Sequence, residues 1–311
     1  MIQSIVGRGG MGSIYLADDN RLPGRMCAVK EVEHEPGIPD ELNAQARAQF
    51  YREASVLARL DHQNLPKVSD YFSDETRDFL VMDYVPGDDL KTLLDRARAA
   101  GRLLPIDEVL DWAQQICSAL AYLHSQDPPV IHRDVKPSNL KLTPSGLIKL
   151  VDFGLVKQMA PDEMTITVIQ GRGTALYTPL EQYGGDTGHT SPRSDLYAMG
   201  ATLYHLFTNQ APLEAKQRFL NPDALVPPRQ LNPALPPPIE DAILWAMALH
   251  PDDRPASIEA FQEAIASGLP VGGLERPLRD AIRRHLPTRL DQALAATALA
   301  LLALALLLSL S

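Results

Sequence analysis

The sequence predicts an α+β protein with two lobes, a small β-rich lobe followed by a larger helical lobe. Within the first 86 residues, short apolar runs alternate with turn residues and surround one helical segment. After Gly87 the pattern changes to longer amphipathic helices. Strands followed by a run of helices are typical of the α+β class. The 311 residues have room for one such domain of roughly 250–270 residues and an appendage.

The composition is that of a globular protein and argues against a nucleic-acid partner. Apolar residues make up 45% of the chain and charged residues 22%, which is ordinary for a protein with a buried core. The formal net charge is -10 and the densest basic run, Arg283-Arg284-His285, is small, so a polyphosphate would be repelled. Cys27 and Cys117 lie far apart without metal-ligand spacing, which favours a reducing cytosolic setting for the main domain.

A glycine cluster, Gly7-Arg8-Gly9-Gly10-Met11-Gly12, comes so early that we expect no signal peptide before it. Ile5-Val6 precedes the cluster and Ile14-Tyr15-Leu16 follows it, so the pattern predicts strand, turn, strand. The glycines would let the backbone approach a phosphate without a side-chain clash. An ordinary hairpin also fits. A dinucleotide site would need a helix directly after the glycines, so the second strand argues against it.

Two charged residues of the first lobe interrupt apolar patterns. Met26 to Val32 predicts a strand with Lys30 on its apolar face, and Glu41 to Leu60 predicts a helix that contains Glu53. The apolar positions of this helix are Phe50, Ala54, Leu57 and Leu60. In the plain interpretation both charges lie near solvent, because an unpaired charge is costly to bury. In the sharper interpretation Glu53 pairs with Lys30 and holds that lysine on phosphate groups.

The remaining elements follow from apolar periodicity and turn residues. The expected strands are Lys67–Phe72 and Asp78–Val85. The expected helices are Asp88–Ala100, Ile106–Ser125 and Ser194–Phe207. The expected buried stripe of the second helix is Leu110, Ile116, Leu120 and Leu123, with Trp112 and Cys117 also packing. The proline-rich stretch Leu220–Pro238 is expected to be a surface loop.

The helical lobe contains a cluster of polar residues suited to phosphate chemistry. It consists of Ile131-His132-Arg133-Asp134-Val135-Lys136-Pro137-Ser138-Asn139, followed by Val151-Asp152-Phe153-Gly154. Two carboxylates, a lysine and an amide could hold a divalent cation and a phosphate while a hydroxyl is deprotonated. For His132 we predict packing near Phe153 rather than the role of a general base.

These motifs, taken in order, resemble those of bacterial Hanks-type (eukaryotic-like) serine/threonine protein kinases. The glycine cluster, Ala28-Val29-Lys30, Glu53, the 131–139 stretch and Asp152-Phe153-Gly154 all have counterparts there. The resemblance covers roughly residues 1–268. It implies the two-lobed protein kinase fold, with an N-lobe at 1–86 that contains helix C and a C-lobe at 87–268.

The resemblance also implies roles for individual residues. Asp134 would accept the proton of the substrate hydroxyl, and Lys136 would neutralise charge on the transferred γ-phosphoryl group. Asn139 and Asp152 would hold Mg²⁺ or Mn²⁺. The implied catalytic residues are Asp134, Lys136, Lys30 and Glu53.

The implied nucleotide is ATP. Met82 would be the gatekeeper beside the adenine, and the backbone of Asp83 and Val85 would contact the base. Lys141 stands where many relatives have an apolar residue under adenine, and its aliphatic stem could substitute. The full implied ATP-binding set is Gly7, Arg8, Gly9, Gly10, Met11, Gly12, Ile14, Ala28, Lys30, Met82, Asp83, Val85 and Lys141.

The polar segment after Gly154 resembles an activation loop. We expect autophosphorylation at Thr165 or Thr167, with Arg133 binding the phosphothreonine. Transfer between two copies would need a homodimer. Thr174 is expected to contact Asp134 and Lys136.

Three further residues of the helical lobe have structural roles by resemblance. Glu181 would pair with Arg254, and Asp195 would brace the backbone of the catalytic loop. Thr178-Pro179-Leu180 departs from the usual Ala-Pro of the family, which bears on the geometry of the substrate-binding loop.

The C-terminal region differs from the rest of the chain. Residues 269–292 predict a juxtamembrane linker, and Ala293 to Leu310 is apolar apart from Thr297 and Ser309. About 18 residues span roughly 27 Å as a helix, enough to cross a bilayer. A helix packed on the domain is the alternative, but the segment has no polar face.

Arginines precede the apolar segment and no charge follows it. By the positive-inside rule we expect a single-pass protein of the cytoplasmic membrane with its kinase domain in the cytoplasm. Either the chain is tail-anchored or an external sensor region is missing. The stub of first strand before the glycines indicates that the N-terminus is truncated or its start misassigned.

Three function classes follow from these observations. The first is a serine/threonine protein kinase that acts on protein substrates in membrane-linked signalling. The second is a catalytically silent nucleotide-binding pseudokinase scaffold at the membrane, which the presence of every catalytic and metal residue disfavours. The third is a small-molecule phosphotransferase, which usually lacks a segment like Gly173-Thr174 to Glu181.

Overall fold

The computed structural model of the chain describes residues 1–9, 12–33, 40–74, 77–152, 172–183 and 190–267. The chain divides into a unit Met1–Leu269 and a unit Pro270–Ser311. The second unit lies outside the described residues. Among the described residues, no helix is both long and apolar enough to cross a membrane. The predicted apolar segment 293–310 lies outside them.

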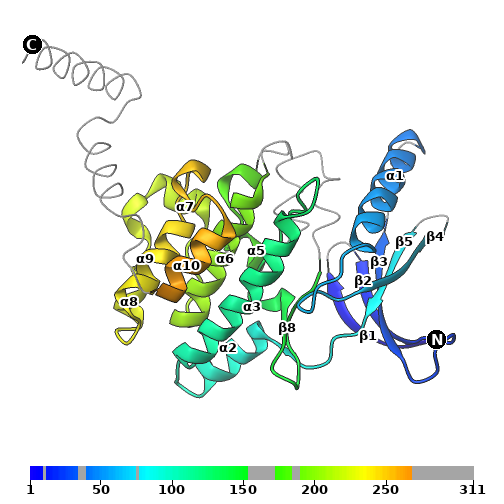
Figure 1. Cartoon of the computed structure of the whole chain (residues 1–311), viewed down its shortest axis with the longest axis horizontal. Coiled ribbons are helices and arrows are strands. Elements are labelled where there is room, and N and C mark those ends of the chain that lie inside the picture. Colours follow the sequence, from blue (N-terminus) through cyan, green and yellow to red (C-terminus); the bar gives the residue numbers. More distant parts are fainter. Residues whose placement is uncertain (10–11, 34–39, 75–76, 153–171, 184–189, 268–311) are drawn as a thin grey trace, which may run out of the picture. The chain divides into compact units, whose positions relative to one another are not determined.

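The N-lobe is built on an antiparallel five-stranded sheet with the order β1-β2-β3-β5-β4 (Figure 1). Its strands are β1 Ile2–Gly9, β2 Gly12–Asp18, β3 Met26–Glu33, β4 Val68–Ser73 and β5 Arg77–Asp83. Helix α1, Asp40–Leu57, contacts β4 and β5. Strands β1, β2 and β3 pair in chain order, and β4 pairs with β5. Helix α1 lies between β3 and β4 in the chain, and the strand that pairs with β3 is β5.

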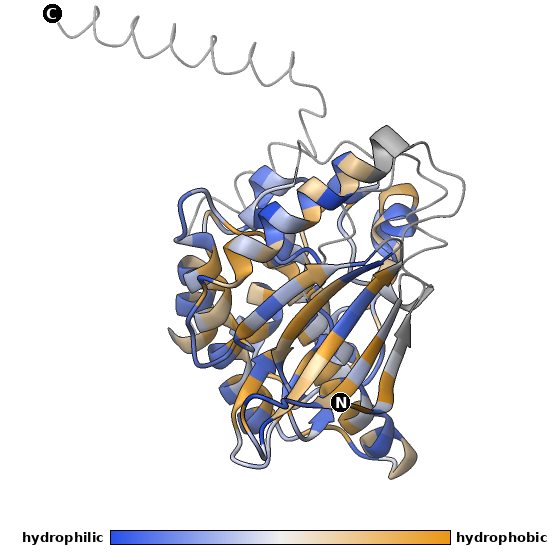
Figure 2. Ribbon diagram, turned by 90° about the vertical axis from the view of Figure 1, so that its right-hand side faces the viewer, coloured by the Kyte–Doolittle hydropathy of each residue, from blue (hydrophilic) through white to orange (hydrophobic). Residues whose placement is uncertain are grey.

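Alternation of burial along the strands gives this sheet a covered face. In β5, Asp78, Leu80 and Met82 are buried, and the residues between them are more exposed. Figure 2 shows the same alternation of hydrophobic and hydrophilic residues along the strands. On α1 and just after it, the predicted stripe of Phe50, Ala54, Leu57 and Leu60 is buried. That prediction is confirmed.

Gly12 is required where the first hairpin returns as β2. Its φ is +138°, and a Cβ atom built there would lie 1.9 Å from the carbonyl oxygen of Glu31 on the neighbouring strand. Only a residue without a side chain fits both the backbone conformation and this close approach. The hairpin therefore depends on one of the glycines that the sequence singled out.

The C-lobe is mainly helical and has a small three-stranded sheet with the order β6-β7-β8. Its strands are β6 Asp88–Asp89, β7 Leu140–Leu142 and β8 Ile148–Leu150. Its α-helices are α2 Leu90–Ala99, α3 Ile106–His124, α5 Arg172–Ala175, α6 Pro192–Thr208, α7 Ala215–Leu220, α8 Pro228–Leu231, α9 Pro237–Ala246 and α10 Ile258–Ser267. Helix α6 is buried over almost its whole length, and α3, α9 and α10 contact it. It is the central helix of the lobe.

Three predictions about the C-lobe need correction. The helix expected from Asp88 begins at Leu90, because Asp88 and Asp89 pair with β7 and Asp89 caps the helix through the backbone nitrogen of Thr92. The buried stripe of α3 includes Val109 in place of the predicted Leu110, which is only half-buried, whereas the predicted Ile116, Leu120 and Leu123 are buried. Leu220–Pro238 is not wholly loop: it contains α8 and the first residues of α9, whose N-terminal prolines suit a first helical turn.

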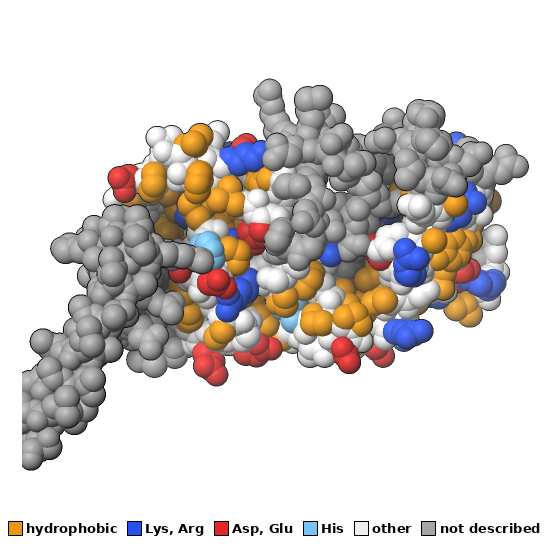
Figure 3. All heavy atoms as spheres, turned by 90° about the horizontal axis from the view of Figure 1, so that it is seen from above, with side chains coloured by type: hydrophobic (Ala, Val, Ile, Leu, Met, Phe, Trp, Pro, Cys, Tyr) orange, Lys and Arg blue, Asp and Glu red, His pale blue; other side chains and the backbone are white. Residues whose placement is uncertain are grey.

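The described surface carries both signs of charge. On the face seen in Figure 3, Lys and Arg side chains are interspersed with Asp and Glu side chains, and hydrophobic side chains lie between them.

Candidate active site

The catalytic-loop stretch is fixed to the C-lobe by one buried carboxylate, that of Asp195 on α6. Its Oδ2 accepts a hydrogen bond from the backbone nitrogen of His132 (2.8 Å), and its Oδ1 accepts one from that of Arg133 (2.8 Å). The Nε2 of His124, the last residue of α3, lies 2.9 Å from Oδ2. The predicted bracing by Asp195 is confirmed. Arg133 has a φ of +66°, and these bonds hold the loop in that left-handed conformation.

Asp195 is kept ionised by its partners. Burial on its own would raise the pKa of this carboxyl, but the hydrogen bond and charge of His124 and the contacts with His132 bring the pKa below its ordinary value. His132 is itself fully buried, and its Nδ1 accepts a hydrogen bond from the backbone nitrogen of Asp134 (3.3 Å). These contacts fit the predicted packing role of His132. Its predicted neighbour Phe153 lies outside the described residues.

Asp134 sits at the centre of a network of side chains. Asn139 Nδ2 donates to its carbonyl oxygen (2.8 Å) and to its Oδ2 (2.9 Å), and Lys136 Nζ lies 3.0 Å from the same Oδ2. Lys136 Nζ also donates to Thr174 Oγ1 (2.9 Å). The predicted contact between Thr174 and Lys136 is therefore confirmed, and the one between Thr174 and Asp134 stays a prediction. A carboxylate oriented in this way can receive a proton from a hydroxyl.

Lys30 and Asp152 form an ion pair. Lys30 lies on β3 of the N-lobe, and Asp152 comes two residues after the end of β8 in the C-lobe. Asp152 has a φ of +65°, and the backbone nitrogen of Val151 donates to the carbonyl of Asn139 (2.8 Å). That bond brings Asp152 and Asn139 together. The sequence predicted that Glu53 pairs with Lys30, and that pair stays a prediction.

Asn139 and Asp152 fit a hard divalent cation. The amide nitrogen of Asn139 is used on Asp134, so the amide oxygen is the atom that can act as a ligand. Together with a carboxylate oxygen of Asp152 it offers the oxygen donors that Mg²⁺ and Mn²⁺ prefer. Within the described ranges no cluster of three His, Cys, Asp or Glu could hold a metal.

Glu53 is half-buried on α1. It interacts with the charge of Arg52 in its own lobe and with that of Arg133 in the other lobe. Its Oε1 accepts a hydrogen bond from Gln49 Nε2 (2.6 Å). Burial raises the pKa of Glu53, although the Gln49 bond and the charges of Arg133 and Arg52 act in the opposite direction. Burial likewise lowers the pKa of Arg133, opposed by the charges of Glu53 and Asp195. Glu53 and Arg133 thus attract each other across the two lobes.

The connection between the lobes follows β5. Met82 is buried and pairs with Ala28 of β3, and Val85 is buried just beyond the strand. The side chain of Asp83 is turned to Arg25, whose Nη2 lies 2.9 Å from Asp83 Oδ1. The contact of the Asp83 and Val85 backbone with a base stays a prediction.

Comparisons with known proteins agree with this arrangement. A family model described as "Protein kinase domain" matches residues 1–263. The chain belongs to the protein kinase family.

Its similar relatives include bacterial serine/threonine kinases. It is 34% identical over 281 residues to "Serine/threonine-protein kinase PknA" of Mycobacterium tuberculosis, covering 86% of this chain and 60% of that protein. It is 30% identical over 269 residues to "Probable serine/threonine-protein kinase PknB" of Lactococcus lactis, covering 84% of this chain and 40% of that protein. The chain thus spans about 40–60% of the length of these curated relatives.

Solved kinase structures have the same fold. The M. tuberculosis PknI kinase domain superposes with a TM-score of 0.63 at 27% identity, covering 86% of this chain and 96% of that one. The structure titled "PpkA-294 apo form" gives a TM-score of 0.66 at 26% identity, covering 85% and 95%. The predicted N-lobe of strands with one helix and the helical C-lobe are confirmed.

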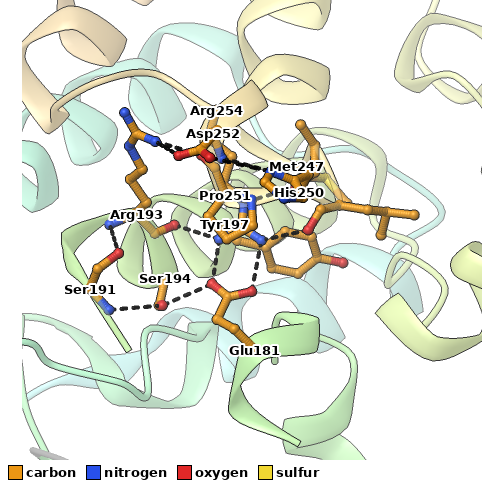
Figure 4. A network of polar contacts seen from close by, with 12 residues as sticks. Glu181, Ser191, Arg193, Ser194, Tyr197, Met247, His250, Pro251, Asp252 and Arg254 are labelled. Carbon is orange, nitrogen blue, oxygen red and sulfur yellow. Dashed lines mark hydrogen bonds and ion pairs between the residues drawn. The ribbon is translucent and has the colours of Figure 1, made fainter. Parts of the chain in front are cut away.

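The described segment 172–183 is anchored near its end by the predicted ion pair of Glu181 and Arg254 (Figure 4). Arg254 Nη1 and Nη2 donate to the two oxygens of Glu181 (2.6 and 3.0 Å), and Ser194 Oγ donates to Glu181 Oε1 (2.8 Å). Burial alone would raise the pKa of Glu181, but the bond and charge of Arg254 bring it below the ordinary value. Thr178, the departure from Ala-Pro, donates its hydroxyl to the carbonyl of Thr174 (3.0 Å) and is accommodated.

Tyr197, which the sequence does not single out, extends this anchor towards α7. The guanidinium of Arg254 lies 5.1 Å from the centre of the Tyr197 ring, and that of Arg218 lies 5.8 Å from it. Arg218 Nη1 also donates to the Tyr197 hydroxyl (3.1 Å) and to the carbonyl of Met247 (2.9 Å). Nothing in the local pattern distinguishes Tyr197 from its apolar neighbours on α6.

Some predicted positions fall outside what the structure describes. These are Gly10, Met11, Phe153, Thr165 and Thr167. Gly7 and Gly9 lie in β1, and Ile14 pairs with Lys30 between β2 and β3.

Proposed function

We propose that the chain is an ATP-dependent serine/threonine protein kinase. The observation that carries this proposal is the network around Asp134, with Asn139 and Lys136 on its carboxylate and Lys136 also on Thr174. A silent scaffold has no need of an oriented carboxylate beside a lysine. The names of the bacterial relatives support serine and threonine as the acceptor residues.

In the proposed reaction the hydroxyl oxygen of a protein Ser or Thr attacks the γ-phosphorus of ATP. The bond from that phosphorus to the β,γ-bridging oxygen breaks and ADP leaves. Asp134 orients the hydroxyl and receives its proton, and Lys136 stabilises the negative charge on the transferred group. Lys30 would bind the α- and β-phosphates, supported by Glu53. A divalent cation held by Asn139 and Asp152 would neutralise phosphate charge when bound.

The test compares the wild-type chain with Asp134→Asn on a generic basic protein and radiolabelled ATP. We expect label on Ser and Thr with the wild type, and a loss of about 10²–10⁴ in rate with Asp134→Asn. Binding of ATP should be unchanged. A wild type that binds ATP without transferring label would establish the scaffold alternative instead.

We also propose autophosphorylation of Thr165 or Thr167, by transfer between two copies. Arg133 supports this proposal, because it stands directly before Asp134 and a guanidinium pairs well with phosphate. Mass spectrometry of active protein should find one of the two threonines modified, and the rate should rise with protein concentration. An unmodified loop in an active preparation would contradict the proposal.

A third proposal concerns the C-terminal region. We propose that residues 293–310 cross the cytoplasmic membrane once, after a linker at 269–292, and that the kinase domain faces the cytoplasm. The apolar composition of the segment and the arginines before it support this arrangement. Fractionation should recover the full chain with membranes and release it only with detergent. Recovery as a soluble protein without detergent would refute the anchor.

A further inference from the structure

Helix α6 holds the catalytic loop at two places. Asp195, near the start of the helix, accepts hydrogen bonds from the backbone nitrogens of His132 and Arg133. Seven residues further along α6, the hydroxyl of Thr202 donates to the carbonyl of Val135 in the middle of the loop (3.3 Å). Residues seven apart lie on the same side of an α-helix. One side of α6 therefore faces the catalytic loop.

His205 lies about one turn further along this side of α6 and contacts a different part of the site. Its Nδ1 lies 2.7 Å from the hydroxyl of Tyr177 in the segment 172–183, and the two rings stack with their centres 6.2 Å apart. Both side chains are buried, since only 4% of His205 and 7% of Tyr177 is exposed. Breaking a hydrogen bond between two buried groups is costly, because water does not replace the lost partner. This contact therefore fixes Tyr177 relative to α6.

The surroundings of the pair keep both members uncharged at neutral pH. Burial raises the pKa of the Tyr177 hydroxyl, so the hydroxyl keeps its proton. Burial also lowers the pKa of His205 to about 4, and the charges of Arg98 and Lys91 on α2 act in the same direction, against that of Asp95. A neutral imidazole has one ring nitrogen that can accept a hydrogen bond. In this pair the hydroxyl is assigned as the donor and Nδ1 as the acceptor.

Tyr177 is connected to the catalytic loop through the backbone of its own segment. Its backbone nitrogen donates to the carbonyl of Thr174 (3.0 Å), and the hydroxyl of Thr178 donates to the same carbonyl (3.0 Å). The hydroxyl of Thr174 accepts from Lys136 Nζ, which lies 3.0 Å from Asp134 Oδ2. An unbroken series of contacts therefore connects the last turns of α6 with the lysine beside the catalytic carboxylate.

We propose that His205 is a positioning residue for phosphoryl transfer, which acts through Tyr177 and Thr174 on Lys136. The catalytic loop and the segment 172–183 are both bonded to α6, so the His205 contact sets where Thr174 lies relative to the loop. A displacement of about 1 Å at a catalytic group can cost on the order of 10²-fold in rate. This inference rests on the proposed kinase function. Neither His205 nor Tyr177 is among the site residues that the sequence identified.

The experiment compares four substitutions in the full chain. Tyr177→Phe removes the hydroxyl and keeps the ring, and His205→Leu removes the acceptor. His205→Asn keeps an acceptor, because the amide oxygen of asparagine is as many bonds from the Cα atom as Nδ1 of histidine. Tyr204→Phe is the matched control: Tyr204 is a buried tyrosine of α6 whose hydroxyl donates to the carbonyl of Val226 (2.9 Å), outside both the catalytic loop and the segment 172–183.

Three quantities are measured for each variant. A transfer assay with ATP and a generic basic protein gives kcat and KM, and urea denaturation gives the free energy of unfolding. Hydrogen–deuterium exchange is followed at the backbone amides of Tyr177 and Thr178, which bond to the carbonyls of Thr174 and Ala175. The exchange rates report on the geometry of the segment without any need for activity.

We expect Tyr177→Phe and His205→Leu each to lower kcat about tenfold, with KM for ATP within about twofold of the wild type. Exchange at the two amides should become faster in both. The double variant should be no slower in transfer than either single variant, because both substitutions remove the same bond. His205→Asn should retain most of the rate. Tyr204→Phe should lose as much stability as Tyr177→Phe and keep the wild-type kcat and exchange rates.

Two results would overturn the inference. Equal effects of Tyr177→Phe and Tyr204→Phe on kcat would mean that the Tyr177 hydroxyl acts on stability alone. A double variant in which the two losses of kcat multiply would mean that His205 does not act through Tyr177. A wild type that transfers no label would instead refute the proposed kinase function. The exchange rates would then decide whether the bond holds the segment, and unchanged rates in Tyr177→Phe would refute that as well.

Discussion

The charged site residues of the C-lobe and those of the N-lobe find their partners in different ways. In the C-lobe, Asp195 is bonded to the loop at 132–133 and Glu181 to Arg254, all within one lobe. In the N-lobe, Lys30 reaches across to Asp152, and Glu53 is attracted to Arg133. The packing of the C-lobe alone therefore positions the site residues of that lobe, whereas the partners of Lys30 and Glu53 depend on how the two lobes contact each other. Substitutions should separate the two: C-lobe anchors should govern stability, and N-lobe charges should govern activity.

Arg254→Met should give the largest loss of stability. It leaves the buried carboxylate of Glu181 without its cation, which typically costs about 3–5 kcal/mol in the free energy of unfolding. Urea denaturation of the wild type and the variant measures it. The double variant Glu181→Gln with Arg254→Met should recover part of the loss, because no buried charge is then left unpaired. A loss below about 1 kcal/mol for Arg254→Met would place this pair with the weak surface ion pairs.

This contrast also explains how much could be predicted from the sequence. His132 to Asn139 are consecutive, so the catalytic loop brings its own residues together, and the motif order identified them. Glu181, Asp195 and Arg254 are distant in sequence, but the family resemblance located them correctly. Their contacts lie within one lobe and follow from its packing.

What the sequence left open depends on long-range geometry. The partner of Lys30 in this structure is Asp152, and no local pattern of β3 contains that information. Tyr197 looks like any apolar position of α6 until Arg218 and Arg254 are placed beside its ring. The prolines of Leu220–Pro238 predict a loop where they break helices, but at the start of α8 and α9 they favour a first helical turn.

Glu53→Gln should sharpen the comparison from the N-lobe side. Because burial raises the pKa of Glu53, its charge opposes folding at neutral pH, and removal of the charge should stabilise the fold. Phosphoryl transfer should fall about 10- to 100-fold, because Lys30 loses its proposed support. Unfolding and transfer measured on the same preparation check both parts. A variant that is less stable and fully active would reverse the assignment.

Acid should weaken the C-lobe anchors in a defined range. The folded-state pKa values of Glu181 and Asp195 lie below their ordinary values of 4.5 and 3.8. Their stabilisation is complete above those values and is lost as the pH falls through the lower folded-state pKa values. Each unit of such a shift is worth about 1.4 kcal/mol. Denaturation from pH 6 to pH 3 should show this decline, and Glu181→Gln should make it shallower. An equal slope in the variant would contradict the role of Glu181.

Tyr197→Phe should give the smallest effect. It removes one hydroxyl that accepts from Arg218 and leaves the ring between the two guanidinium groups. Loss of one such bond is worth about 1 kcal/mol in the free energy of unfolding. A much larger loss in the free energy of unfolding would mean that the Tyr197–Arg218 hydrogen bond is as important for stability as the Glu181–Arg254 ion pair.

The most direct test of the two-lobe account is a crystal structure with a nonhydrolysable ATP analogue and Mg²⁺. The account predicts that the Asp134, Asn139, Asp195 and Glu181–Arg254 contacts stay as they are. It also predicts that the ammonium of Lys30 leaves Asp152 for the phosphates, with Glu53 beside it. A complex in which Lys30 stays on Asp152 while the C-lobe contacts rearrange would contradict it.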